Sequence, residues 1–180
     1  MHHRQVLDFW FAEGTRRAWF RSTPELDARI REQFEAAWRR AAHGDMDHWA
    51  TSAEGALALV IMLDQLPLNM FRGQPGSFAT EHKAIAVCKA AIDADLDRPL
   101  SGSQLAFLYM PLMHSEALAD HDRSVALFEA AGLDDNLRFA RHHRELIRRF
   151  GRFPHRNAIL GRDSTAEESA YLASDQAFKG

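Results

Sequence analysis

The sequence has one cysteine, no long hydrophobic run and no excess of positive charge. Cys88 alone cannot form an intramolecular disulfide, and a chain with a single thiol suits a reducing compartment. The longest purely apolar run covers residues 56–63, far short of the roughly 18 residues that a membrane-spanning helix needs. The formal net charge of −3 does not favour a nucleic-acid partner. We therefore expect a soluble, cytoplasmic protein with no membrane segment.

Recognised catalytic and cofactor motifs are also missing. The chain contains no HExxH, GxSxG, GxxxxGK(S/T), GxGxxG or paired CxxC pattern. His114 and His121 look like a metal pair, but seven residues correspond to about 10 Å along one helix, which is too far for a shared ion. Asp120 and Asp122, on either side of His121, are expected to face solvent. The sequence therefore predicts no metal site and no cofactor.

The chain does have helical periodicity from end to end. Over residues 22–44, a Ser-Thr-Pro start and a terminal glycine enclose an apolar stripe at steps of three and four. Further helices are expected at about residues 53–66 and about residues 78–93. The first should be buried because it is apolar all round, and Ser77 should cap the second. Cys88 and the tryptophans of the first quarter are predicted to lie in the core.

The second half of the chain continues in the same way. Two helical pieces follow, with Pro111 ending or kinking the first of them. An amphipathic helix then ends at Gly151, and a final helix begins at STAEE, where a serine or threonine and a glutamate can form a cap. No run alternates as a strand would. These features predict an all-α fold of antiparallel helical hairpins in a single compact domain covering residues 1–180.

Positive charge is concentrated near the C-terminus. Residues 134–163 hold eight arginines against four carboxylates, which gives +4, so the remainder has 14 basic and 21 acidic side chains, or −7. Guanidinium groups match phosphate and carboxylate, so this segment could recruit an anionic ligand. It could instead neutralise the protein's own carboxylates, which is the commoner arrangement. RNA binding is weakly supported, because the aromatic residues between the arginines are expected to be buried.

Helical periodicity predicts which histidines face the core and which face solvent. His143 shares a face with Phe139 and other apolar residues, so it should point inward, whereas His142 should point outward. His114 also lies on an apolar face. Inward histidines are more often hydrogen-bonded core residues than ligands or bases, and both interpretations stay open here.

Asp64 is the most notable acidic residue. It directly follows the apolar run of residues 56–63 and is expected to be buried, where an unpaired carboxylate is costly. The arginines of residues 134–163 are the obvious partners. Asp64 is therefore either half of a structural salt bridge or an acid positioned in a polar pocket.

Several long and uncommon signatures follow one another over nearly the whole chain. They are VLDFWF, LALVIMLDQLPLNMFRG, FATE, FLYMPLMHSEALAD, RFGRFPHRNAILGR and STAEE. Together they resemble a bacterial family of unknown function, DUF924. The resemblance implies an all-helical fold of the tetratricopeptide-like superfamily and implies no activity. Two positions depart from the family pattern, with Leu68 in place of arginine and His121 in place of glutamine.

The family's motif positions include most of the polar residues discussed above. We expect one polar groove that binds an anionic small ligand or a peptide terminus. Its lining residues are Asp64, Gln65, Asn69, Arg72, His114, His143, Arg152, His155, Arg156 and Asn157. The alternative is a hydrolase or transferase in which His114 or His155 is the general base, and Asp64 or Glu116 orients it. A purely structural polar network is the third interpretation, and homo-oligomerisation stays open.

Overall fold

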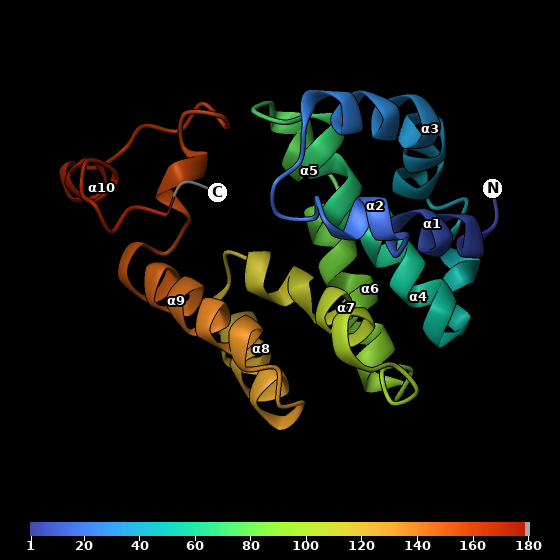
Figure 1. The fold of residues 1–180 in the computed structure, drawn as a ribbon. Coiled ribbons are helices and arrows are strands. Elements are labelled where there is room, and N and C mark those ends of the chain that lie inside the picture. Colours follow the sequence, from blue (N-terminus) through green and yellow to red (C-terminus); the bar gives the residue numbers. More distant parts are fainter. Residues whose placement is uncertain (179–180) are drawn as a thin grey trace. The chain divides into compact units, whose positions relative to one another are not determined.

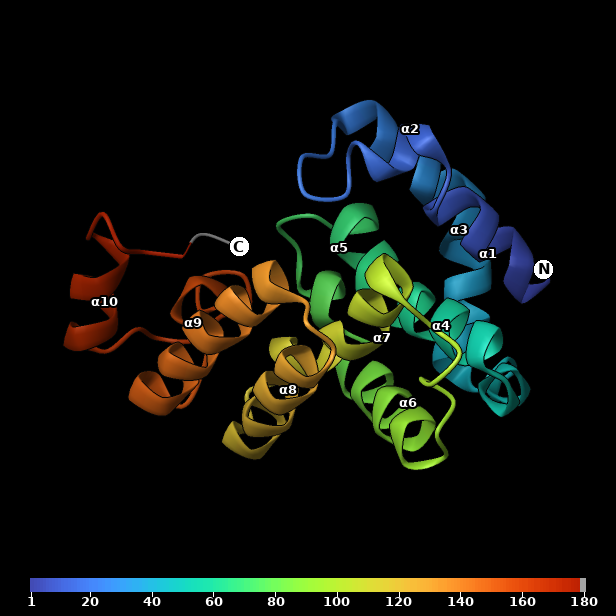
Figure 2. The same cartoon turned by 60° about the horizontal axis from the view of Figure 1, so that its bottom comes forward.

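The computed structural model describes residues 1–178, which fold into helices joined by short turns (Figures 1 and 2). Over these residues no strand forms, so the all-α prediction is confirmed. The helices are α1 (His3–Trp10), α2 (Glu13–Arg16), α3 (Pro24–His43), α4 (Ala53–Val60), α5 (Leu66–Met70), α6 (Glu81–Asp93), α7 (Gly102–His114), α8 (Leu118–Ala130), α9 (Asp134–Phe150) and α10 (Ala166–Leu172). Among residues 1–178, none of the helices is long and apolar enough to cross a membrane.

The chain divides into two compact units. Unit 1 consists of Met1–Arg72 and Gly76–Pro111, and unit 2 consists of Gly73–Pro75 and the chain from Leu112 onward. The division falls inside α7. The expectations of one domain over residues 1–180 and of a tetratricopeptide-like arrangement stay predictions.

In unit 1, α4 continues through a π-helical turn, Ile61–Gln65, into α5. Residues 55–67 are all buried, as the apolar run predicts, and the helical path extends to Met70 rather than to residue 66.

Pro67 explains the π turn. In a regular α-helix its ring would collide with the carbonyl of Leu63, four residues earlier. Here that carbonyl accepts a hydrogen bond from the Thr80 hydroxyl at 2.6 Å, and Thr80 in turn accepts one from Trp38 Nε1 at 3.0 Å.

The Thr80 hydroxyl is expected to contribute measurably to stability. Thr80→Val keeps the shape of the side chain but leaves the buried Leu63 carbonyl without its donor, which costs about 1–3 kcal/mol. Equilibrium urea unfolding measures this loss, and Thr80→Ser, which keeps the hydroxyl, is the matched control. Equal stabilities for the valine and serine variants would contradict the assignment.

The predicted start and cap of one helix were wrong, and for another helix the structure excludes one of two alternatives. Helix α6 begins at Glu81 rather than near residue 78, because Pro75–Phe78 forms a 3-10 turn. Ser77 caps no helix, since its hydroxyl donates to the carbonyl of Phe71 at 2.6 Å. Of the two alternatives for Pro111, an end or a kink, the structure excludes the end, because α7 continues to His114. The residues flanking Pro111 are buried, and tertiary packing of this kind can outweigh one lost backbone hydrogen bond.

Other helix ends agree with the sequence. Thr23 caps α3, which ends at Gly44 in a left-handed conformation with φ of 109°. Helix α9 ends in the same way at Gly151, with φ of 69°. At the start of α10, Thr165 and Glu168 form a capping box. Local sequence signals therefore locate the two glycine ends to the residue, and they narrow each N-terminal cap to two neighbouring candidates, of which the structure shows one.

The predicted core residues are largely confirmed. Trp10, Trp49 and Cys88 are buried, and the other two tryptophans are half-buried. Phe20, which neighbours Trp19 in the sequence, is not part of this core, because 76% of its surface is exposed in the turn that follows α2. In unit 2, α8 and α9 form an antiparallel hairpin and pack side by side along their length (Figures 1 and 2). Helices α8 and α9 of this hairpin carry His121 and His143 of the candidate site.

Candidate functional site

The predicted site residues are divided between the two units. Asp64, Gln65, Asn69 and Arg72 belong to unit 1, whereas His114, Glu116, His143, Arg152, His155, Arg156 and Asn157 belong to unit 2. A single groove lined by all of them stays a prediction. Each group has its own set of contacts within its unit.

In unit 1, Asn69 and Arg72 bind a carboxylate of the protein. Asp27 of α3 accepts hydrogen bonds from Asn69 Nδ2 at 2.7 Å, from Arg72 Nε at 2.8 Å and from the Ser22 hydroxyl at 2.6 Å. Burial raises the pKa of Asp27, but these donors outweigh it and hold the pKa below the usual value. Asn69 and Arg72 therefore join the end of α5 to the start of α3.

Asp64 is buried, as predicted, with 3% of its surface exposed. The Gln65 amide donates to Asp64 Oδ2 at 2.5 Å and also contacts the sulfur of Met110 at 3.3 Å. Gln65 thus connects Asp64 in the π turn to α7. The arginines expected to pair with Asp64 belong to the other unit, and that pairing stays a prediction.

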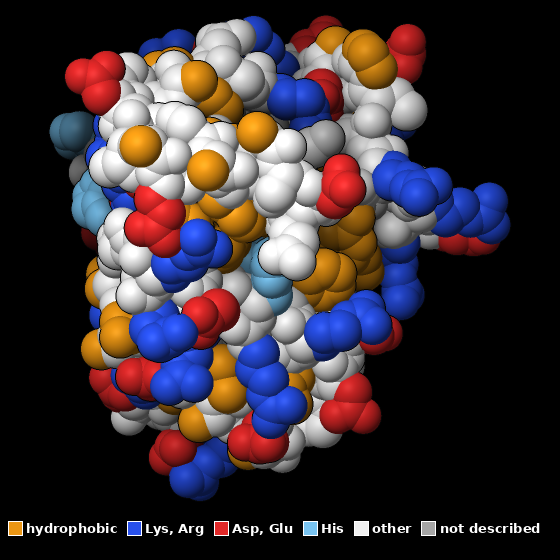
Figure 3. All heavy atoms as spheres, turned by 90° about the vertical axis from the view of Figure 1, so that its left-hand side faces the viewer, with side chains coloured by type: hydrophobic (Ala, Val, Ile, Leu, Met, Phe, Trp, Pro, Cys, Tyr) orange, Lys and Arg blue, Asp and Glu red, His pale blue; other side chains and the backbone are white. Residues whose placement is uncertain are grey.

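In unit 2, most arginines pair with carboxylates of the same unit. The exposed pairs are Arg138–Asp135, Arg141–Glu129, Arg144–Asp122, Arg148–Glu145 and Arg149–Glu167. Figure 3 shows basic and acidic side chains interspersed across the face that it displays, without a patch of one sign. Of the two roles that the sequence left open for the arginines, the structure therefore shows neutralisation of the protein's own carboxylates.

Arg152 and Asn157 converge on the buried carboxylate of Glu168. Arg152 Nε and Nη2 donate to its two oxygens at 2.6 and 2.8 Å, and Asn157 Nδ2 donates at 3.3 Å. The backbone N–H of Thr165 adds a fourth hydrogen bond at 2.8 Å. The hydrogen bonds from Arg152, the largest influence, and from these other donors lower the pKa of Glu168 to about 2. This network fixes the chain between α9 and α10, and the sequence had indicated Glu168 only as a capping residue.

A second carboxylate, Glu116, holds the backbone of Phe153. Its Oε1 accepts the Phe153 N–H at 2.9 Å, and both of its oxygens accept from Arg162, at 2.7 and 3.0 Å. Burial alone would raise the pKa of Glu116. The hydrogen bonds from Arg162 and the Phe153 N–H have the larger combined effect, so the pKa lies below its usual value and the side chain is ionised. Arg156 donates to the His114 carbonyl at 3.0 Å, and its guanidinium lies 4.5 Å from the centre of the Phe153 ring.

Three histidines surround the ring of Phe153. Ring centres of His143 and His155 each lie 5.5 Å from that of Phe153, and the ring centre of His121 lies 5.9 Å away. We call these three histidines and Phe153 the histidine cluster. Burial lowers the pKa of all three, to about 3 for His143 and about 4 for His155, and nearby charge on His114 lowers them further. The three imidazoles are therefore neutral at pH 7.

Backbone carbonyls fix the tautomers of two of these histidines. His121 Nε2 lies 2.7 Å from the Ser115 carbonyl oxygen, and His143 Nδ1 lies 3.3 Å from that of Met113. A carbonyl can only accept, so these ring nitrogens carry the single proton of each neutral imidazole. The other nitrogens, His121 Nδ1 and His143 Nε2, are therefore bare acceptors. Both are buried and have no hydrogen-bond partner.

The segment after α10 covers the cluster. The ring of Phe178 lies 4.6 Å from that of His143 and 5.0 Å from that of His155, measured between ring centres. The Phe178 N–H donates to the Tyr171 hydroxyl at 2.8 Å, and Ala177 packs on the apolar residues around Phe153. The C-terminal segment thus returns over α9 and encloses two of the three imidazoles.

Predictions for the histidines are partly confirmed. His143 is buried and His142 is exposed, as expected, and His114 is half-buried. Phe139 was wrongly placed on the inward face, since 47% of its surface is exposed and it lies beside the guanidinium of Arg138. The apolar stripe of α9 therefore follows Leu137, Ala140 and His143 rather than Phe139.

The segment around His121 also needs correction. His114 and His121 lie on different helices, because α7 ends at His114 and α8 begins at Leu118, so a distance along one helix does not apply. Asp120 is buried rather than solvent-facing and accepts a hydrogen bond from the Ser115 hydroxyl at 2.7 Å. Asp122 is exposed, as predicted.

Sequence reasoning did not place His121 in the site. The available signal was helical periodicity, because His121, Ser124 and Phe128 are spaced by three and four residues and are all fully buried. Over residues 1–178, no group of three or more His, Cys, Asp or Glu side chains is arranged to hold a metal ion. The distinguishing feature of the histidine cluster is therefore the unpaired ring nitrogens of His121 and His143.

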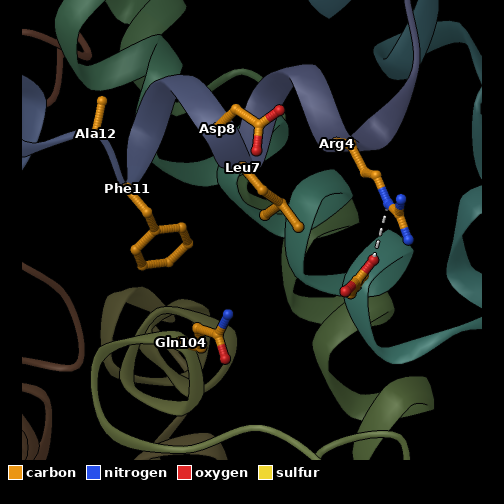
Figure 4. A pocket seen from close by; sticks show the side chains of 7 residues that line it. Arg4, Leu7, Asp8, Phe11, Ala12 and Gln104 are labelled. Carbon is orange, nitrogen blue, oxygen red and sulfur yellow. Dashed lines mark ion pairs between the residues drawn. The ribbon is translucent and has the colours of Figure 1, made fainter.

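A separate hollow of about 500 Å³ lies on unit 1 between α1 and the start of α7 (Figure 4). It is lined by Arg4, Leu7, Asp8, Phe11, Ala12, Glu54 and Gln104. Arg4 pairs with Glu54 at 3.5 Å across its rim, and both side chains are more than half exposed. The hollow is open to solvent, and it contains none of the residues predicted from the sequence.

The structure thus defines an all-α protein with a buried cluster of neutral histidines in unit 2. Residues 6–176 match the family model described as "Bacterial protein of unknown function (DUF924)", and the chain belongs to this family. A solved structure of a protein of unknown function from Agrobacterium tumefaciens is 37% identical, with a TM-score of 0.88. That match covers 95% of this chain and 96% of the other. No curated protein matches. The family resemblance seen in the sequence is therefore confirmed.

Proposed function

We propose that this protein binds a small polar ligand at the histidine cluster of unit 2. The observation that supports this is the pair of buried acceptors, His121 Nδ1 and His143 Nε2, that have no protein partner. An unpaired buried polar atom costs about 1–3 kcal/mol, so such atoms call for a specific explanation. A ligand that hydrogen-bonds to both nitrogens would remove this cost.

The geometry supports binding better than general acid–base catalysis. A base acts best when its pKa lies near the working pH, whereas burial, with smaller effects of nearby charges, lowers the pKa of His143 to about 3 and of His155 to about 4. The Ser115 hydroxyl donates to Asp120, and His121 contacts the carbonyl of Ser115 rather than its hydroxyl. A serine nucleophile with an adjacent histidine base is therefore not arranged here.

Access to the cluster would require movement of the C-terminal segment. Phe178 lies against His143 and His155, and residues 173–176 beside it are exposed. Displacement of this segment would remove Phe178 from His143, whose Nε2 is unpaired, and from His155. Within this proposal the ligand is small or the terminus of a peptide, and the protein acts in the cytoplasm.

Thermal unfolding with a panel of small probes tests this function. The panel contains inorganic phosphate, acetate, acetamide and glycerol. A probe at ten times its Kd adds about 1.4 kcal/mol of stability, which corresponds to roughly 3–6 °C in Tm for a chain of this length. We expect at least one probe to raise the Tm of the wild type and of His142→Gln, in which an exposed imidazole is lost.

The same probe should leave the Tm of His143→Gln unchanged. If that variant does not fold, ring-nitrogen NMR of the wild type replaces it, and the probe should then shift the signals of His143 more than those of His142. Absence of any Tm or NMR response to the whole panel would refute the proposed function.

A further inference from the structure

The chemistry of the two unpaired nitrogens defines the ligand class. Resting on the proposed function, we infer that the ligand of the histidine cluster is recognised as a hydrogen-bond donor. Its N–H or O–H groups donate to Nδ1 of His121 and to Nε2 of His143. This class differs from the anionic ligand that the arginine content of the sequence suggests.

The acceptor character of these atoms follows from their neighbours. If either ring adopted the opposite tautomer, a nitrogen lone pair would face a carbonyl oxygen, at 2.7 Å for His121 and at 3.3 Å for His143. That arrangement replaces a hydrogen bond with repulsion between two acceptors. Each ring therefore keeps a lone pair on its unpaired nitrogen, which can accept a hydrogen bond from a ligand.

Double protonation of these imidazoles would make both nitrogens donors, but their surroundings oppose it. His121 is fully buried, and 6% of the surface of His143 is exposed. Burial, together with charge on His114 and on Arg156 near His121, disfavours an added positive charge. The lone pairs consequently remain at neutral pH, and they repel the oxygens of a carboxylate, which can only accept.

The terminal guanidinium nitrogens beside the cluster donate to other groups, although Arg162 Nε and the Ser124 hydroxyl are themselves buried without a partner. Arg162 donates to Glu116, and Arg152 donates to Glu168. Arg156 donates to the His114 carbonyl and stacks on Phe153. Because this guanidinium already supplies positive charge beside the cluster, a neutral donor fits better than a cation. The faces of Phe153 and Phe178 add apolar walls. An amide or hydroxyl compound has the required combination of a neutral donor and a small apolar body.

NMR of protein with ¹⁵N-labelled histidine rings tests this inference directly. In the free protein at pH 7, we expect the proton on Nε2 of His121 and on Nδ1 of His143. Acetamide and N,N-dimethylacetamide then form a matched pair of probes, because they share a carbonyl but only the first has N–H groups. We expect acetamide to shift the signals of His121 Nδ1 and His143 Nε2, and the dimethyl compound to leave them unchanged. The exposed His142 is the internal control.

Each outcome of this experiment separates the inference from the proposed function. If acetate, which has no N–H or O–H group at pH 7, shifts the ring signals of the cluster while acetamide does not, the function stands and the donor class is overturned. Opposite tautomers in the free protein also overturn the donor class. If the two bare nitrogens already accept hydrogen bonds in the free protein and acetamide does not alter them, an ordered water alone occupies the site and the inference fails. If no probe changes the spectrum or the Tm, the proposed function itself fails.

Discussion

Replacing Glu168 with alanine is expected to lower the free energy of unfolding by about 3 kcal/mol. Its carboxylate, which is nearly inaccessible to solvent, accepts hydrogen bonds from Arg152, Asn157 and the Thr165 N–H. Removal of one partner of a buried ion pair typically costs about 3–5 kcal/mol, because it leaves the other charge unpaired. Arg152 keeps 28% of its side chain exposed and can turn partly to water, so the lower end of that range applies.

The neighbouring Glu167 provides a matched control. It pairs with Arg149, and the two side chains are 59% and 48% exposed, so Glu167→Ala should cost about 0–1 kcal/mol. Both variants lose one carboxylate from the first turn of α10, so the difference between them reports the buried Arg152 network together with the hydrogen bond that Glu168 accepts from the Thr165 N–H. Urea unfolding at pH 7 measures both. Equal losses of stability would contradict a stabilising role for this buried network.

Glu168 also shows what local sequence signals can and cannot predict. The STAEE signature predicts its capping role, because a capping box depends on a fixed spacing of three residues. Its pairing with Arg152 could not be predicted, since the two residues are separated by a turn whose path no spacing rule describes. Arg152 and Asn157 were accordingly placed among the groove residues, while the arginines' partner was left open between a ligand and the protein's own carboxylates; the structure shows both side chains hydrogen-bonded to Glu168.

The histidine cluster was predicted in part for a related reason. His143 lies within a long amphipathic helix, where periodicity gives its direction correctly. His121 lies just after the break between α7 and α8, and continuing the helix through that break gave the wrong geometry. The sequence also left open whether Pro111 ends or kinks α7, and the structure shows the helix continuing three residues beyond it. Tertiary burial, rather than local propensity, decides where this helix stops.

Acidification is expected to destabilise the protein strongly, starting below pH 6.5. Burial, reinforced by charge on His114, lowers the pKa of His143 to about 3 in the folded state, against 6.5 for the unfolded chain. At pH 7 the side chain is neutral in both states. Below pH 6.5 the unfolded chain binds a proton that the folded protein excludes, so the free energy of unfolding falls by about 1.4 kcal/mol per pH unit. This loss continues until the pH reaches about 3.

The other two histidines of the cluster act in the same direction. Burial also lowers the pKa of His155, to about 4, and that of His121. Glu168 contributes in a separate window. Hydrogen bonds, chiefly from Arg152, lower its pKa from 4.5 to about 2, so its contribution is complete above pH 4.5 and is lost as the pH falls toward 2. Between pH 6.5 and pH 4.5, the change in the free energy of unfolding therefore comes mainly from the histidines.

Urea unfolding at several pH values between 7.5 and 5 measures this dependence. Between pH 7 and pH 5, His143 alone should account for about 2 kcal/mol of lost stability. His143→Gln removes the titrating group, so its stability should depend less steeply on pH than that of the wild type. His142→Gln removes the adjacent exposed imidazole and should retain the wild-type slope. If the free energy of unfolding of the two variants depends equally on pH between pH 6.5 and pH 5, then His143 takes up a proton in the folded protein over this range. Its Nε2 is then a donor, and the acceptor on which ligand recognition depends is absent.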